Sequence, residues 1–349
     1  MSAGDPQREP DQLEGVLLPE QAPRLIGHET AFAALIDQAG EGRLPGAILL
    51  HGPRGIGKAS FAFTLAKQVL TMTGDEPAER VDEQIAAGVH PNIFVLRRRA
   101  RDTNGFYAAI RVEDVRDVQH RMRQTRGRAG YRICVVDSID DCNQSSANAL
   151  LKILEEPPAE TLFLLVSHRP GSLLPTIRSR CHAYALRGLD AAAVQMIVAA
   201  QVPEADSAML QRAVELADGR PQRAFEALMI EGLDTLDTLQ RWLNAPASQP
   251  AGVHLQLADA IAKAGGAEAA FARDMLIGWM ADEARAASMA GPLARNRLAS
   301  ATELWDKAHA VFADADAYNL DARQTLVSIF DALRQHARLH MHLAPAGQS

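Results

Sequence analysis

The sequence predicts an α/β fold. A five-stranded parallel sheet carries a phosphate-binding loop after its first strand, and two all-helical regions follow. Three observations support this prediction. Five short apolar segments alternate with amphipathic segments in the first half of the chain, as in sheets that helices cover on both faces. A glycine-rich loop with a lysine follows the first apolar segment. After residue 190 only helical periodicity remains.

The bulk composition is that of an ordinary globular protein with more than one domain. The chain has 349 residues, 47% of them hydrophobic, and a net charge of -7. This acidic balance means that any contact with nucleic acid needs a local basic face. The three cysteines have no metal-ligand spacing, which disfavours a zinc site or a disulfide framework and fits a cytoplasmic protein. No apolar segment is long enough for a membrane span, so no membrane association is expected.

The glycine-rich loop reads His-Gly-Pro-Arg-Gly-Ile-Gly-Lys over residues 51–58 and joins a predicted strand (47–50) to a predicted helix (60–70). Its glycines let successive backbone N–H groups face phosphate oxygens, and Lys58 reaches the terminal phosphates. The alternative is a chance turn, because Ala59 stands where the pattern needs a hydroxyl for Mg²⁺. The loop residues predicted to bind nucleotide are Gly52, Pro53, Arg54, Gly55, Ile56, Gly57, Lys58, Ala59 and Ser60.

Four more apolar segments are predicted as strands, and one of them ends in a carboxylate. Because parallel strands end at one edge of a sheet, Asp137 is expected beside the loop, where it can orient Mg²⁺ through water in the Walker B role. An apolar segment that ends in aspartate is weak evidence without the loop upstream. Ser167 ends another strand and is also expected near the phosphates. The four strands are predicted at residues 92–96, 132–137, 161–167 and 182–186.

The domain organisation follows from changes in composition and periodicity. Residues 1–22 are polar and contain proline, which predicts a disordered lead-in. Residues 23–187 form the predicted P-loop domain, and residues 188–243 form a small helical domain. A proline-bearing linker precedes a third region, residues 251–345, which is helical throughout.

An arginine-rich segment stands out within this acidic protein. Residues 97–132 contain eleven arginines against four acidic residues. One interpretation is a basic face for a nucleic-acid backbone. The other is a solvated surface, because the whole chain prefers arginine and has only five lysines. Both interpretations stay open, and the candidates for DNA contact are Arg97, Arg98, Arg99 and Arg101.

Three motifs in this order resemble the AAA+ clamp-loader subunits of bacterial replication. They are the loop at residues 51–58, Ala-Asn-Ala-Leu-Leu-Lys-Ile-Leu-Glu-Glu-Pro-Pro at 147–158, and Leu-Pro-Thr-Ile-Arg-Ser-Arg-Cys at 174–181. The resemblance implies an AAA+ P-loop domain, a helical lid domain and an all-α collar that holds subunits together. It implies that Arg180 is an arginine finger for the ATP of a neighbouring subunit. It also implies that Ser167 is sensor 1 and that Arg223 is the sensor 2 arginine of the lid.

Two departures from the family pattern concern hydrolysis. Ala59 replaces the Mg²⁺-binding hydroxyl, and Ser60 is poorly placed to take over because one helical residue turns the side chain by about 100°. Ser138 stands where the active ATPases of the family have a glutamate that polarises water. Loss of such a base commonly lowers the rate about 10²-fold or more. We expect weak or absent ATP or ADP binding, doubtful Mg²⁺ and no zinc, since residues 67–130 lack the cysteines of the gamma-type zinc module.

Two functional hypotheses follow. The first is a hydrolysis-deficient subunit that supports ring assembly and loads the sliding clamp onto primer-template DNA, with clamp-loader subunits of the gamma/tau and delta types as partners. The second is a catalytically active AAA+ ATPase of another DNA-processing complex. A simple scaffold with a vestigial loop differs from the first only in whether Arg180 matters. Ala59 and Ser138 favour the first hypothesis.

Overall fold

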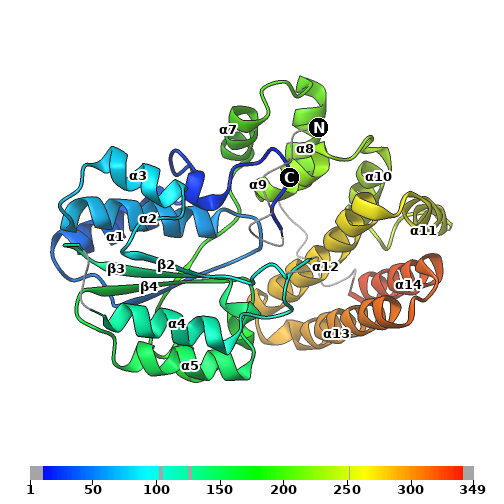
Figure 1. The fold of residues 1–349 in the computed structure, drawn as a ribbon. Helices are drawn as coiled ribbons and strands as arrows, with labels where there is room; N and C mark the ends of the chain where they lie inside the picture. The colour runs from blue at the N-terminus through cyan, green and yellow to red at the C-terminus, as the bar shows by residue number, and fades with distance from the viewer. Residues whose placement is uncertain (1–10, 102–104, 125–127, 251, 341–349) are drawn as a thin grey trace. The chain divides into compact units, whose positions relative to one another are not determined.

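The computed structural model of the chain describes residues 11–101, 105–124, 128–250 and 252–340 (Figure 1). The chain divides into two compact units, Met1–Phe225 and Glu226–Ser349. The boundary between them falls inside the predicted lid domain of residues 188–243, so the three-part division remains a prediction. The described helices include none that combines the length and the apolar character needed to cross a membrane.

A five-stranded parallel sheet forms the centre of the first unit, which confirms the predicted α/β class. Its strands are β1 (Ala47–His51), β2 (Ile93–Leu96), β3 (Arg132–Asp137), β4 (Thr161–Ser167) and β5 (His182–Ala185). They lie in the order β2-β3-β4-β1-β5, and every pair is parallel. All five predicted strands are present, and no strand end differs from the prediction by more than one residue.

Helices cover both faces of this sheet (Figure 1). Alternate residues of each buried strand point to opposite faces: Leu162 and Leu164 of β4 join one apolar cluster, while Phe163 joins the other. The first cluster packs under α1 (Glu29–Gly40), α2 (Lys58–Thr73) and α3 (Ala78–Ala86), and the second under α4 (Val112–Arg123) and α5 (Gln144–Glu155). The near-continuous apolar strands therefore reflect burial on both sides.

The sheet order brings the loop and the acidic strand end to one edge. Strand β1 lies between β4 and β5, and β4 lies between β1 and β3. His51 is in register with Ser167, and Asp137 is in register with Val166. In open α/β sheets, ligands bind beyond the carboxyl ends of the strands where the connections diverge. The edge that carries His51, Asp137 and Ser167 is therefore where a site is expected.

Short helices complete the first unit. The turn α6 (Pro175–Arg178) precedes β5, and α7 (Ala191–Gln201) and α8 (Ser207–Ala217) follow it. Asp190 and Asp206 cap the last two helices, since each carboxylate accepts a backbone N–H three residues ahead. Helix α9 (Pro221–Leu228) begins in this unit.

The second unit is helical over its described residues. Its helices are α10 (Asp234–Asn244), α11 (Val253–Ala264), α12 (Gly266–Met289), α13 (Arg295–Tyr318) and α14 (Ala322–His340). Helix α12 packs against α13, and α14 packs against α11 and α13. Glu283 of α12 accepts hydrogen bonds from Arg297 of α13 at 2.6 and 2.7 Å and lies 3.1 Å from His336 of α14, which ties the three helices together. Of the predicted third region, residues 251 and 341–345 lie outside the described residues.

The expectation of a disordered lead-in does not hold for residues 11–22. Residues 1–10 lie outside the described part of the chain. Pro19–Gln21 forms a short 3-10 helix, and Leu18 and Glu20 are buried. The physical reason is a long-range ion pair: Glu20 binds Arg97, 77 residues ahead, at 3.2 Å. Composition alone could not reveal that partner.

Candidate functional site

The phosphate-binding loop has the backbone conformation that the sequence predicts. Gly52, Gly55 and Gly57 have φ angles of +152°, +81° and +90°. A side chain is excluded at Gly52, because a Cβ there would lie 2.1 Å from the Leu186 carbonyl oxygen. Glycine tolerates these angles at little steric cost. The loop then enters α2 at Lys58, so that the helix N-terminus faces the concave side of the loop.

Lys58 turns inward onto its own loop. Its side chain is buried, and Nζ donates to the carbonyl oxygens of Gly52 at 3.0 Å and Pro53 at 2.5 Å. Burial lowers the pKa of Lys58 to about 7, although the nearby Asp137 and Asp140 carboxylates oppose the shift. A bound polyphosphate would place negative charge next to the Lys58 ammonium group and so stabilise its protonated form.

We predict that nucleotide affinity falls as the pH rises from 7 to 9. Because the pKa of Lys58 in the free site is about 7, the side chain loses its proton above that pH. Phosphate favours the ammonium form, so binding takes up a proton, and affinity weakens by up to about tenfold per pH unit. Titration calorimetry in buffers of different ionisation enthalpy measures this uptake. Lys58→Arg, which keeps its charge, should show a flat profile, and a flat wild-type profile would contradict the prediction.

The acidic side of the site is formed by the end of β3. Burial raises the pKa of Asp137 to about 6, against the opposing charge of Arg97. Ser138, at the position of the family's glutamate, is buried and donates its hydroxyl to Asp140 at 2.9 Å. Where the family's active ATPases have a glutamate that polarises water, this chain has the short Ser138 side chain, and its hydroxyl is already engaged in a hydrogen bond.

Asp140 is a residue of the site that the sequence patterns did not reveal, and it lines the cavity. Its carboxylate accepts hydrogen bonds from Ser138 Oγ, from Ser167 Oγ at 3.0 Å, and from the backbone N–H groups of His168 at 2.6 Å and Arg169 at 3.1 Å. Burial alone would raise the pKa of Asp140, but these hydrogen bonds outweigh it and hold the pKa below its ordinary value. The residue therefore locks the end of β3 to the end of β4.

The two predicted sensor residues are buried away from the cavity. Ser167 is fully buried, and its hydroxyl points to Asp140. Arg223 is also buried, and neither residue lines the cavity beside the loop. His168, next to Ser167, does line it, and burial together with the charge of Lys58 lowers the pKa of His168 to about 4. Sensor roles for Ser167 and Arg223 remain predictions.

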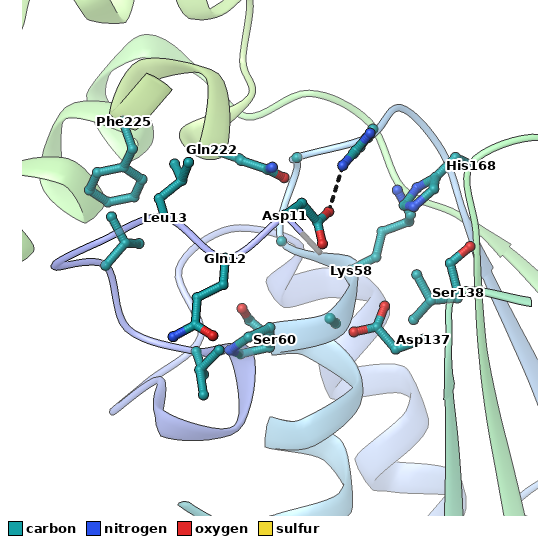
Figure 2. A pocket seen from close by; sticks show the side chains of 18 of the residues that line it. Asp11, Gln12, Leu13, Lys58, Ser60, Asp137, Ser138, His168, Gln222 and Phe225 are labelled. Carbon is teal, nitrogen blue, oxygen red and sulfur yellow. Dashed lines mark hydrogen bonds and ion pairs between the residues drawn. The ribbon is translucent and has the colours of Figure 1, made fainter. Parts of the chain in front are cut away.

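Ala59 and Ser60 both line the cavity. Ala59 offers no oxygen to a metal ion. In Figure 2, Ser60 and Asp137 lie on different sides of the first turn of α2. This agrees with the expectation that one step along the helix turns the Ser60 side chain away from the direction of Ala59. Among the described residues no group of three or more His, Cys, Asp or Glu side chains could hold a metal ion.

The cavity has a volume of about 440 Å³ and opens between the loop and the small helices of the same unit. Gln222 and Phe225 of α9 line it, and the Gln222 N–H donates to the Gly55 carbonyl oxygen at 3.2 Å (Figure 2). On the other side it is lined by residues 11–13 and 16–19. The loop backbone, the α2 N-terminus and Lys58 fit a polyphosphate, while the divalent-metal ligands of a hydrolytic site are incomplete.

Arg180 lies apart from this cavity. Its side chain is exposed just after α6, where it forms an ion pair with Glu155 at 2.7 Å and donates to the Thr176 carbonyl oxygen at 3.0 Å. It lines a separate hollow with His182 of the edge strand β5. Arg180 is not among the residues that line the loop cavity, and its role as an arginine finger remains a prediction.

Three of the four candidate DNA-contact arginines are engaged in ion pairs. Arg97 pairs with Glu20, Arg98 with Asp141 at 3.0 Å and Arg99 with Asp114 at 3.0 Å. The Arg97 side chain is only 13% exposed, so it does not present a basic surface. Arg101 is exposed and stacks on Tyr107. A DNA-contact role for the four arginines remains a prediction, with Arg99 and Arg101 the more accessible.

The sequence profile of the family described as "DNA polymerase III, delta subunit" matches residues 27–190. Residues 27–190 are therefore similar to the DNA polymerase III delta-subunit family. The match includes the loop, Asp137 and Arg180, and it ends before Arg223. It confirms the resemblance to clamp-loader subunits that the three sequence motifs indicate.

Relatives of the DNA polymerase III family agree with this assignment. The chain is 37% identical over 185 residues to the delta' subunit of Pseudomonas aeruginosa, covering 51% of this chain and 54% of the relative. It is 31% identical over 209 residues to the delta' subunit of Yersinia pestis, covering 57% and 60%. It is 32% identical over 176 residues to the tau subunit of Escherichia coli, covering 49% and 26%. The chain thus spans about half of the delta' relatives and less of tau.

Proposed function

We propose that this chain is a delta'-type subunit of a bacterial clamp loader, a hydrolysis-deficient AAA+ module that supports loading of the sliding clamp onto primed DNA. One observation carries the proposal: the exposed Arg180 lies outside the chain's own cavity, while the cavity lacks a hydroxyl at Ala59 and a carboxylate at Ser138. A guanidinium supplied in trans stabilises the charge of a transferring phosphoryl group. The chain would therefore serve a neighbour's ATP while its own loop holds nucleotide weakly or not at all.

Reconstitution tests this proposal. Subunits of the gamma/tau and delta types, the sliding clamp and a primed circular DNA are mixed with or without this chain, and clamps retained on the DNA are counted. We expect efficient loading only when the chain is present, and co-elution of the chain with the other subunits. Loading that proceeds equally well without it, or a chain that never joins the assembly, would overturn the proposal.

We also propose that primer-template DNA is contacted by the exposed part of the arginine-rich segment. Replacing Arg99 and Arg101 together with alanine should make the salt dependence of DNA binding by the assembled loader shallower, by roughly 0.7–0.9 for each phosphate that is no longer neutralised. Arg285→Ala, an exposed arginine in the helical unit, serves as the control. A slope unchanged by the double substitution would assign the segment to a solvated surface.

A further inference from the structure

Residues 11–21, here called the N-terminal strap, run along the same cavity as the phosphate-binding loop. Asp11, Gln12 and Leu13 line the cavity together with Arg54 and Lys58 of the loop (Figure 2). The sequence predicts disorder for the strap and weak or absent nucleotide binding at the site that it borders. Its contacts therefore bear directly on what the loop can bind.

The C-terminal end of the strap is anchored. Leu18 is 4% exposed, and its N–H donates to the Gln21 side chain at 3.0 Å. Glu20 binds Arg97 through both carboxylate oxygens at 3.2 Å, with both side chains largely buried. A buried pair with two hydrogen bonds is costly to break. This end of the strap is thus fixed to the body of the domain.

The other end of the strap reaches the phosphate-binding loop. Asp11 Oδ2 lies 2.9 Å from the Arg54 guanidinium, a side chain that the sequence places in the phosphate-binding motif. In Figure 2 the Asp11 carboxylate lies on the Lys58 side of the cavity. Burial would raise the pKa of Asp11, but the charge and hydrogen bond of Arg54 outweigh it and keep the carboxyl ionised. The carboxylate of Asp11 therefore occupies a position beside the cationic Arg54 side chain of the loop.

We infer that Asp11 stands in for a nucleotide phosphate on Arg54, so that the strap and a nucleoside polyphosphate compete for the loop. Carboxylates and phosphates are recognised by guanidinium in the same way. The pair with Arg54 is partly exposed, with side-chain exposures of 57% and 36%, and such pairs are weak enough to exchange. The inference rests on the proposed function in one respect, since it requires a loop that can hold a nucleotide. It adds that the strap competes with the nucleotide for this loop.

Equilibrium binding tests the competition. A fluorescent ATP analogue is titrated into the full chain, and Asp11→Ala is expected to tighten binding about fivefold. Glu14→Ala is the matched control: it removes a carboxylate from the same strap for which no ion pair occurs among the described residues, and it should change affinity less than twofold. In an Arg54→Ala background, Asp11→Ala should bring no further gain, because the pair is already broken.

Hydrogen exchange supplies a second readout. The Val16 N–H donates to the Leu13 carbonyl oxygen at 3.2 Å, between the two ends of the strap. Saturating analogue should speed exchange at Val16 and leave the anchored Leu18 unchanged. Unchanged or weaker binding by Asp11→Ala, a gain that persists without Arg54, static exchange at Val16, or no binding to any variant would each overturn the inference. None of these outcomes affects the clamp-loading test, which judges the proposed function separately.

Discussion

Replacing Arg180 with alanine is expected to lower ATP turnover at the neighbouring site of a reconstituted clamp loader by about 10³-fold or more. The guanidinium would stabilise charge that develops on the transferring phosphoryl group, and alanine leaves that charge uncompensated. Arg180→Lys should restore little, because an ammonium group lacks the planar fork of donors. The measurement is turnover by a loader in which the other ATP sites are silenced through their own loop lysines.

Two variants near Arg180 act as controls. Arg178→Ala removes an exposed arginine from the same segment and should leave turnover within about twofold. Glu155→Ala removes the partner at 2.7 Å, and since an exposed pair contributes about 1 kcal/mol or less, it should also have a small effect. Wild-type turnover by a loader that has incorporated the Arg180→Ala chain would reject the finger assignment.

Replacing Asp140 with alanine is expected to destabilise the first unit by about 2–4 kcal/mol. The substitution leaves the hydroxyls of Ser138 and Ser167 and the N–H groups of His168 and Arg169 without the acceptor they share. Hydrogen exchange along β3 and β4 is the suitable measurement, because the chain has two units that need not unfold together. Asp141→Ala is the control, since that neighbour pairs with Arg98 at one partly exposed site. Equal effects of the two variants would contradict a special role for Asp140.

The pH dependence gives a second check on Asp140. Its pKa in the folded chain lies below the ordinary value of 3.8. Its contribution to stability is therefore complete above pH 3.8 and is lost as the pH falls below that value through the folded pKa. The wild-type chain should lose stability more steeply in this range than Asp140→Asn, which has no carboxyl to titrate. Parallel curves would exclude a stabilising ionised Asp140.

The sheet could be predicted because its physical cause is local. Strands such as residues 161–167 are buried on both faces, so their sequences are apolar throughout and end where polar residues resume. The loop could be predicted equally well, because glycine is the residue that adopts the backbone angles found at Gly52, Gly55 and Gly57 with little strain. Asp137 could be placed beside the loop since parallel strands share one carboxyl edge.

The features that escaped prediction depend on partners distant in sequence. Asp140 follows the strand end by three residues, and its importance appears only when β4 lies beside β3. The strap has a polar composition typical of disorder, yet Glu20 finds Arg97 in the folded domain. That same pair removes Arg97 from the exposed basic side chains of the arginine-rich segment. The sequence signal that could have pointed to Asp140 is an acidic residue in the turn after the apolar strand that ends in Asp137.

We propose that the chain's own loop does not drive ATP hydrolysis. Steady-state ATP turnover of the isolated full chain, with primed DNA and Mg²⁺ present, tests this proposal. Since Ala59 and Ser138 remove the metal hydroxyl and the base, we expect no turnover above that of the Lys58→Ala variant. Turnover of several per second that disappears with Lys58→Ala would instead establish an active ATPase and overturn this proposal.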